Sequence, residues 1–408
     1  MSKHELSGAR RANLFRSSCV AIVATAMTFG VRADIMDALG SQFRLTNEQT
    51  GWIAGAAFWG FTVSMLLGGM LCDLLGMRSL IAAGFVGHLG GILLTIFATG
   101  FGSLYAGTLA IGLANGLVEA AANPLTSTLY PDRKTERLNK LHVWFPGGIV
   151  IGGLVAYACT RLGLNWQVKM TLILLPVLLY GVLFFQQELP VTERVQHRIS
   201  TGAMYREALR PDFLIMLGCI LLTAATELGP AQWIPSLLTR TAQVSGILVL
   251  IWITGLEAVG RLFAGRLVAR ISPVTLLLCS TLLAAAGLFG LGAAHSRPTI
   301  YLAATVFAAG VCYCWPTMYG ITSERFPVGG AFLLSVMGSV GMLSDAFVVP
   351  LMGRMYDVWG PYRALRSMAI LPVIVAAVFA LIALRDHAHG GYRATQLEPH
   401  AAQDVFDL

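Results

Sequence analysis

The sequence predicts an all-α membrane protein in which twelve transmembrane helices form two similar six-helix bundles related by a pseudo-two-fold axis. Three observations lead to this fold class: an unusually apolar composition, twelve long hydrophobic stretches and an internal repeat. Of the 408 residues, 56% are hydrophobic and 12% are charged, and the mean hydropathy is +0.70. Soluble domains contain about 25% charged residues. The chain therefore lacks the polar surface of a soluble fold, whereas a lipid bilayer solvates an apolar exterior.

Each hydrophobic stretch reaches the length of about 20 residues that a spanning helix needs. The predicted spans are 17–40, 50–71, 79–99, 103–129, 141–162, 167–187, 212–238, 245–269, 273–293, 298–320, 330–352 and 362–384. The longest polar stretch separates the sixth span from the seventh. We therefore predict four regions: an N-terminal bundle (1–187), a cytoplasmic linker (188–211), a C-terminal bundle (212–385) and a disordered cytoplasmic tail (386–408).

The basic residues predict the orientation. Lys3, Arg10, Arg11 and Arg16 precede the first span, and with the N-terminus inside most Lys and Arg residues lie on the cytoplasmic side. We expect a multi-pass protein of the cell (inner) membrane with both termini in the cytoplasm. The net charge is +7, but the sequence has no dense basic run with interleaved aromatic residues. A nucleic-acid partner is therefore not expected.

The two halves contain related segments. Leu125-Thr-Ser-Thr-Leu-Tyr-Pro131 aligns with Ile321-Thr-Ser-Glu-Arg-Phe-Pro327 at an offset of 196 residues, which also superposes Gly69 on Gly265. Duplicated six-helix units are typical of secondary transporters, in which the halves rock about a central site. The repeat therefore predicts that the chain moves a small solute across the bilayer by alternating access.

The loop after the second span reads Gly69-Met-Leu-Cys-Asp73-Leu-Leu-Gly76-Met-Arg78 and resembles the G-x3-D-x2-G-x-R motif of the major facilitator superfamily. Gly69 permits close helix packing, Asp73 can accept hydrogen bonds from a helix N-terminus, and Gly76 permits a tight turn. The counterpart in the second half lacks the Asp but keeps three arginines, Arg261, Arg266 and Arg270. We interpret the motif as a gate latch, a contact that holds the gate closed, in preference to a turn without a functional role.

Ionisable residues at the centre of a span cost about 2.5–3.5 kcal/mol on insertion scales and usually face a cavity or a partner. The candidates are Arg32, Asp34, Asp37, Glu119, Glu227, Glu257 and Asp345. Asn115, Glu119 and Asn123 are spaced four apart, so they line one stripe of a helix, which favours a cavity wall. Glu257 and Arg261 are also four apart and could simply pair in a structural or gating role.

Several of these segments resemble the fucose–galactose–proton symporter family. They are Phe29-Gly-Val-Arg-Ala-Asp34-Ile-Met-Asp37, Gly116-Leu-Val-Glu119-Ala-Ala-Ala-Asn123-Pro124-Leu and Arg137-Leu-Asn-Lys-Leu-His142-Val-Trp144-Phe145. The resemblance covers the first half and implies proton-driven sugar uptake, in which Asp37 and Glu119 handle protons.

The chain departs from this family at several positions. Asp34, a further proton-coupling candidate, stands where the fucose permease has Asn. His142 and Phe145 stand where that permease has a sugar-binding Gln and Asn, and Arg32 adds a charge. The departures leave hexoses or a more polar solute open.

A sugar site needs amide and carboxylate groups for the hydroxyls and aromatic faces for the C–H surfaces. The candidates are Arg32, Asn115, Asn123, His142, Trp144, Phe145, Glu227, Gln232, Trp233, Tyr313, Trp315, Tyr319 and Asp345. Because Trp also populates membrane interfaces, Trp233 could instead be an interface residue. His88 has no evident partner in the sequence and is expected to be structural.

Proton-coupled symport of a sugar or similar small polar solute is our first functional hypothesis, and sodium coupling stays open. Proton-linked export of drugs or metabolites is the alternative for the same fold. A transporter-like sensor is disfavoured because the sequence shows no large signalling loop or tail. An enzyme, a cofactor or a metal site is not expected, because no convincing catalytic set, metal cluster or phosphate loop is present. The expected functional unit is a monomer.

Overall fold

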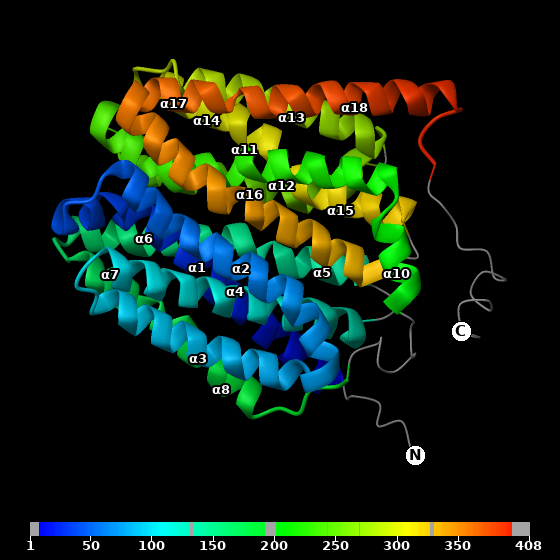
Figure 1. Cartoon of the computed structure of the whole chain (residues 1–408), viewed down its shortest axis with the longest axis horizontal. Coiled ribbons are helices and arrows are strands. Elements are labelled where there is room, and N and C mark those ends of the chain that lie inside the picture. Colours follow the sequence, from blue (N-terminus) through cyan, green and yellow to red (C-terminus); the bar gives the residue numbers. More distant parts are fainter. Residues whose placement is uncertain are drawn as a thin grey trace.

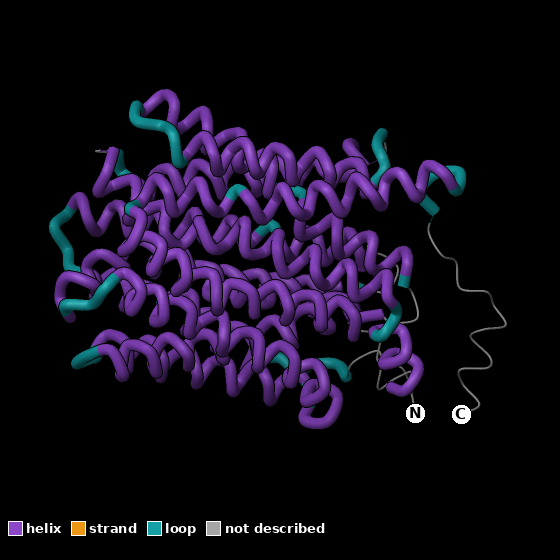
Figure 2. Tube along the Cα trace, turned by 45° about the horizontal axis from the view of Figure 1, so that its top comes forward, coloured by secondary structure: helices purple, strands orange, loops and turns teal. Residues whose placement is uncertain are grey.

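The fold consists of long helices that run roughly alongside one another (Figure 1). The computed structural model describes residues 8–130, 134–191, 201–242, 244–268, 270–326 and 330–393, and the regular elements in these ranges are helices (Figure 2). Twelve helical stretches among them are long and apolar enough to cross a bilayer. The described chain begins and ends at the same end of the bundle, which we call the terminal face; the other end is the opposite face.

Eight of the spans are single helices. They are α1 (Gly8–Phe43), α2 (Asn47–Leu75), α3 (Met77–Ile96), α4 (Phe101–Leu129), α11 (Pro211–Ala242), α12 (Gly246–Val268), α13 (Pro273–Leu291) and α16 (Gly330–Trp359). The other four spans each consist of two segments. They are α5 (Lys134–His142) with α6 (Trp144–Arg161), α7 (Trp166–Leu172) with α8 (Leu174–Phe185), α14 (Arg297–Val311) with α15 (Cys314–Arg325), and α17 (Pro361–Met368) with α18 (Ile370–Ala388).

The four interruptions have a common cause in the sequence. A proline lacks the backbone N–H, and its ring clashes with the carbonyl group four residues earlier. Each interruption falls three to four residues before a proline, namely Pro146, Pro176, Pro316 and Pro372. Proline alone does not decide the outcome, since Pro124, Pro230, Pro235 and Pro350 lie within continuous helices.

The regions predicted as linker and tail are partly helical. A short helix, α10 (Thr201–Ala208), occupies part of the predicted linker, and α18 continues to Ala388, three residues beyond the predicted boundary of the tail. Residues 192–200 and 394–408 lie outside the described residues.

Helix α2 of the N-terminal half packs along α16 of the C-terminal half over most of its length. Near the opposite face, a Cβ added to Gly51 would lie 2.7 Å from the Cα of Pro350. Further along, the Thr62 hydroxyl donates to the Ser339 carbonyl at 3.3 Å. Close to the terminal face, Gly69 approaches the Ser335 side chain. We call this contact the α2–α16 seam; its glycines allow the two backbones to approach closely.

A second contact between the halves joins α6 to α12. Here a Cβ added to Gly153 would lie 2.7 Å from the side chain of Ile251, and Ile247 is also adjacent. Both isoleucines lie in the first two turns of α12. These contacts therefore hold the halves together on the side of the opposite face.

Candidate transport site

Arg32 of α1 lies between the two halves and contacts α11. Its Nε donates to Gln232 Oε1 at 3.1 Å. The guanidinium carbon lies 4.6 Å from the centroid of the Phe29 ring and 5.5 Å from that of Phe58. The side chain is buried, and its Nη2 has no hydrogen-bond partner among the described residues. The structure thus brings two predicted site residues together and leaves one donor of Arg32 free.

Asp37 takes part in closing the opposite face. Its carboxylate pairs with Arg240 of α11 at 2.5 Å and accepts a hydrogen bond from Ser236. Arg240, Asp37 and Asp357 line a cavity of about 270 Å³ between the α1–α2 connection and the ends of α11 and α16. Nearby, Asp357 accepts from the Asn47 side chain at 2.7 Å. These polar contacts tie the halves together at one end of the molecule.

Asp34 does not share the partners of Asp37. Its carboxylate pairs with Lys169 of α7 at 2.5 Å, and the Lys169 ammonium also donates to the Thr160 hydroxyl at 2.7 Å. Both charged side chains are almost buried, at 11% and 10% exposure. All three residues belong to the N-terminal half. This pair holds α1, α6 and α7 together within that half.

The stripe of polar residues on α4 divides between two environments. Asn115 points into the N-terminal half, where its side chain bonds to His88 at 2.7 Å and donates to Thr28 at 3.1 Å. The other ring nitrogen of His88 bonds to the Tyr180 hydroxyl at 2.8 Å. His88 therefore has partners that the sequence did not reveal. The prediction that Asn115 lines a cavity is not supported, because neighbours within one half occupy its amide.

Glu119 and Asn123 form the other part of the stripe, toward the terminal face. The Glu119 carboxyl group is 5% exposed and lies within reach of the Asn123 side chain. The Asn123 Oδ1 in turn lies 3.0 Å from His142 Nε2, at the end of α5. The helix break before Pro146 positions His142, because α5 ends at this residue. A carboxyl, an amide and an imidazole are thus linked on adjacent helices.

Two aromatic residues of α15 complete this group from the other half. The Trp315 and Tyr319 rings stack with centroids 5.9 Å apart and an interplanar angle of 22°. Tyr319 lies within electrostatic range of Glu119 across the interface. Among the predicted site residues of this group, Glu119 and Tyr319 therefore approach each other across the interface, with Asn123 and His142 on one side and Trp315 on the other.

Four candidates of the C-terminal half form a separate charged group. Arg261 of α12 donates to Glu227 of α11 at 3.1 Å and lies 3.7 Å from Glu257. Asp345 of α16 is fully buried, and neither of its carboxyl oxygens has a hydrogen-bond partner among the described residues. Arg261 also lies within electrostatic range of His142 of the other half. We call Glu227, Glu257, Arg261 and Asp345 the C-half cluster.

Three of the remaining aromatic candidates contact other parts of the helix bundle, and the fourth, Trp144, is exposed. Trp233 is buried and donates to the Val349 carbonyl at 2.9 Å, which fixes α11 to α16, so it is not a membrane-interface residue. Phe145 packs against Phe29, with centroids 5.7 Å apart. The Tyr313 hydroxyl donates to the Gly260 carbonyl at 3.2 Å. Trp144 is 44% exposed at the start of α6.

The loop motif has the predicted backbone but only part of the predicted contacts. Gly76 has φ +79°, a conformation that favours glycine and explains the tight turn between α2 and α3. Arg78 contacts the Phe185 carbonyl of the same half at 3.5 Å. In the second half, Arg261 belongs to the C-half cluster and Arg270 is exposed. The side chains of Asp73 and Arg266 lie outside the described part of the structure.

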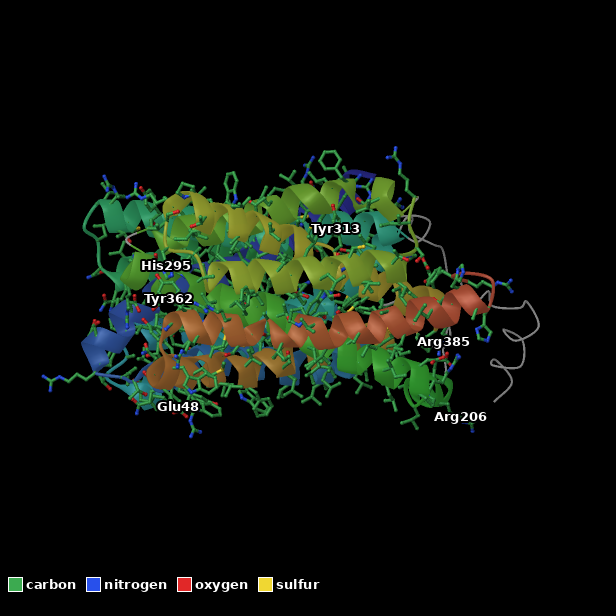
Figure 3. The ribbon with its side chains drawn as sticks, turned by 90° about the horizontal axis from the view of Figure 1, so that it is seen from above. Glu48, Arg206, His295, Tyr313, Tyr362 and Arg385 are labelled. Carbon is green, nitrogen blue, oxygen red and sulfur yellow. The ribbon has the colours of Figure 1, made fainter. Side chains whose placement is uncertain are left out.

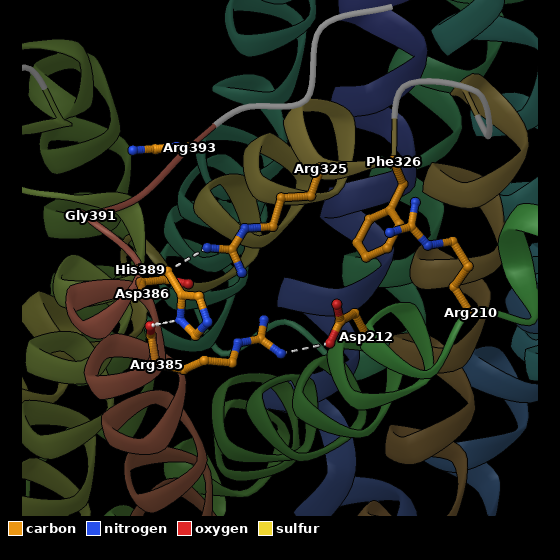
Figure 4. Close-up of a pocket in the computed structure, with 9 residues that line it drawn as sticks. All are labelled: Arg210, Asp212, Arg325, Phe326, Arg385, Asp386, His389, Gly391 and Arg393. Carbon is orange, nitrogen blue, oxygen red and sulfur yellow. Dashed lines mark hydrogen bonds and ion pairs between the residues drawn. The ribbon is translucent and has the colours of Figure 1, made fainter.

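A second cavity lies at the terminal face, where Arg206 and Arg385 are found, whereas Glu48, His295 and Tyr362 mark the opposite face (Figure 3). It has a volume of about 350 Å³ and is lined by charged residues (Figure 4). Arg385 donates to Asp212 at 2.9 Å, and Arg325 pairs with Asp386. The cavity contains none of the predicted site residues, so we assign its charges to packing of the helix ends.

Sequence reasoning missed Arg240, Ser236 and Lys169 as partners of the predicted carboxylates. Comparing how deep each charged residue lies in its span would have indicated Lys169 as a partner. Lys169 and Asp34 both lie toward the ends of their spans at the opposite face. Arg240 follows Ser236 by one helical turn, which places both on one face of α11. Which acid each base contacts depends on the packing of the helices, which the sequence does not specify.

The closed opposite face leads to a testable expectation. Replacing Arg240 with Gln should weaken the contact to Asp37 and increase the population in which this face is open. Partly exposed ion pairs contribute about 0.2–1 kcal/mol, so we expect labelling of a cysteine at Met36, which lines the cavity, to accelerate by up to about fivefold. Maleimide labelling of purified protein lacking its native cysteines measures this rate. An unchanged rate would show that the Asp37–Arg240 pair does not control access.

The fold and the site define a class of protein: a helical membrane protein with charged and aromatic side chains where two six-helix halves meet, as in secondary transporters. Comparison with known proteins gives the family. Residues 15–329 match the sequence profile of the Major Facilitator Superfamily. The chain belongs to this superfamily and is a membrane transporter, not an enzyme.

Individual relatives are distant. The chain is 26% identical over 371 residues to the Escherichia coli 3-(3-hydroxy-phenyl)propionate transporter, covering 85% of this chain and 88% of the relative. It is 28% identical over 167 residues to the Candida albicans myo-inositol transporter 1, which covers 41% of this chain but 30% of that protein. The arabinose-proton symporter of Escherichia coli K12 is 24% identical over 186 residues, covering 45% of this chain and 39% of the symporter.

Solved structures with the same fold include two sugar symporters. A partially occluded, inward-open structure of the xylose transporter XylE from E. coli has a TM-score of 0.77 at 14% identity and covers 92% of this chain and 98% of that one. A structure of the E. coli fucose:proton symporter FucP has a TM-score of 0.66 at 18% identity and covers 91% and 99% of the two chains. These likenesses confirm the major facilitator fold predicted from the sequence.

Proposed function

We propose that this transporter takes up a sugar or a similarly small polar solute together with protons. One observation supports the proposal: Glu119, which is linked through Asn123 to His142, lies within electrostatic range of Tyr319 of the other half, whose ring stacks on Trp315. Carboxylate and amide groups bind hydroxyls, and aromatic faces bind the C–H surface of a sugar ring. The relatives that transport arabinose or myo-inositol support the same substrate class.

In this proposal Glu119 carries the proton. A buried carboxyl group favours its neutral form, and contact with water or a partner favours its ionised form. Opening of either face would therefore change the protonation of Glu119 as the cycle proceeds. The protonation of Asp37 would also change when the opposite face opens, because opening separates its carboxylate from Arg240.

Replacing Glu119 with Gln should abolish proton-driven accumulation while leaving exchange of substrate across the membrane intact, because Gln keeps the shape but does not ionise. Substrate would first be sought by thermal shift with xylose, arabinose, fucose and myo-inositol at two pH values, with and without sodium. Uptake and counterflow in proteoliposomes would then be compared for the two proteins. Glu188→Gln is the matched control, since that side chain is 84% exposed. Normal accumulation by Glu119→Gln would refute the assignment.

An organic acid is the second candidate substrate. The Nη2 of the buried Arg32 has no partner within the described part of the chain, and the Phe29 and Phe58 rings are adjacent, so this side chain could bind a carboxylate joined to an aromatic group. One relative that matches over most of its length is named for such a compound. Uptake of 3-(3-hydroxyphenyl)propionate, measured beside the sugars, would decide between the two classes. Ethidium efflux from the same vesicles would test the export hypothesis.

A further inference from the structure

The C-half cluster contains more negative than positive charge in a buried site. Three carboxyl groups, Glu227, Glu257 and Asp345, are 8%, 5% and 0% exposed. Arg261 is the basic residue that contacts the two glutamates. If all three were ionised, the cluster would have a net charge of −2. A charge that is buried without a partner is strongly destabilising. Bound protons would remove this cost.

Asp345 provides the second observation. Its carboxyl group is completely buried, and among the described residues neither oxygen has a hydrogen-bond partner within normal distance, as is also true of Oε2 of Glu227. The backbone of Gly229 is the polar group that lies near Asp345. Glu227 lies within electrostatic range of Asp345. An ionised carboxylate in such surroundings would be both unpaired and unsolvated, whereas a protonated one is neutral. The cluster therefore has the chemistry of a proton-binding site.

The groups that face the cluster come from several elements. Arg261 Nε donates to the Cys312 carbonyl at 3.1 Å, and the Cys312 thiol donates to the Glu257 carbonyl at 3.4 Å. Tyr313 lies beside Gly260, and Cys314 is buried nearby. His142 approaches Arg261 from the N-terminal half. Arg261 is thus the fixed positive charge within the cluster, and His142 is the titratable group that the other half contributes.

The cluster adjoins the aromatic pair of the proposed substrate site. Trp315 packs against Gly341 of α16, at 2.6 Å from an added Cβ, and Asp345 follows Gly341 by four residues on the same helix. A solute that moved Trp315 would therefore press on the turn of α16 that leads to Asp345. Separation of the halves would also remove His142 from Arg261 and admit water.

We propose that Glu227, Glu257 and Asp345 form a second proton-binding site in the C-terminal half, which exchanges its protons as the halves move apart. The exchange of protons during transport rests on the proposed function, whereas the binding of protons by the cluster does not. The proposal adds a second proton carrier to Glu119 and assigns Glu227 and Asp345 to coupling instead of substrate contact.

Infrared spectroscopy of the purified full-length chain tests proton binding without a substrate. The carbonyl band of protonated carboxylic acids would be followed from about pH 4, where ordinary carboxyl groups titrate, to about pH 9, which buried ones can reach. We expect a component that disappears at the upper end of this range in the wild type and is lost in Asp345→Asn. It should persist in Glu119→Gln and in the exposed-pair control Asp212→Asn.

Glu257→Gln serves as a second variant if Asp345→Asn does not fold. An unchanged band in a folded Asp345→Asn or Glu257→Gln protein would overturn the proposal. Loss of the component on addition of sodium chloride at constant pH would also overturn it, since the bound cation would then be sodium. Failure to transport any sugar would refute the proposed function but leave this band unaffected, so the two failures are distinguishable.

Discussion

Replacing Lys169 with Met should lower the free energy of unfolding by about 3–5 kcal/mol, because Asp34 would remain as an unpaired, nearly buried charge. The Lys169 ammonium contacts both Asp34 and Thr160, so the substitution also removes a link between α1, α6 and α7. Thermal and denaturant unfolding in detergent would measure the loss.

Combining Lys169→Met with Asp34→Asn provides the internal control. The double variant contains no unpaired charge, so it should recover most of the lost stability. Arg10→Met removes a more exposed pair, with Glu188, whose side chains are 39% and 84% exposed, and should have little effect. A stable Lys169→Met protein would contradict a structural role and return Asp34 to the list of proton carriers.

Replacing Gly112 with Ala should destabilise the N-terminal half by about 1–3 kcal/mol. Helix α4 crosses α2 at this residue, and an added Cβ would lie 2.1 Å from the backbone oxygen of Ala57. Since the obstructing atom belongs to the backbone, the helices must move apart, which loses contacts along both. We expect a lower unfolding temperature and a smaller monodisperse fraction in size-exclusion chromatography.

Gly90→Ala is the matched control for this prediction. Gly90 lies in α3, and a Cβ added there meets nothing within 4 Å. Because alanine has a higher helix propensity than glycine, this substitution should be neutral or slightly stabilising. If both variants behaved alike, the close approach of α2 and α4 would not depend on Gly112.

The fold was predictable because its signals are local. Twelve apolar stretches and a repeated segment are sufficient for the class, and the turn at Gly76 follows from one residue type. The four broken spans were missed, although each has a proline after the break. The sequence could not show which prolines interrupt a helix, because Pro124 and Pro350 are accommodated without a break.

The sequence indicated which residues belong to the candidate site but not which neighbour each side chain contacts. Asp34 and Asp37 are three residues apart, yet one contacts α7 and the other α11. Asn115 and Asn123 belong to one stripe, but only Asn123 lies beside His142. A difference of a fraction of a helical turn decides which neighbour a side chain meets. That angle depends on how all the helices pack, so no single segment encodes it.

Two of the contacts between the halves, the α2–α16 seam and the α6–α12 contact, differ in extent. The α2–α16 seam runs from Gly51 to Gly69, whereas the α6–α12 contact lies toward one end. The two halves would then rotate about the α2–α16 seam during the conformational cycle. The ends of α6 and α12 at the terminal face would move furthest. Substrate would enter and leave on the side of the molecule away from this seam, and bulky residues placed along it would lock the transporter without touching the substrate.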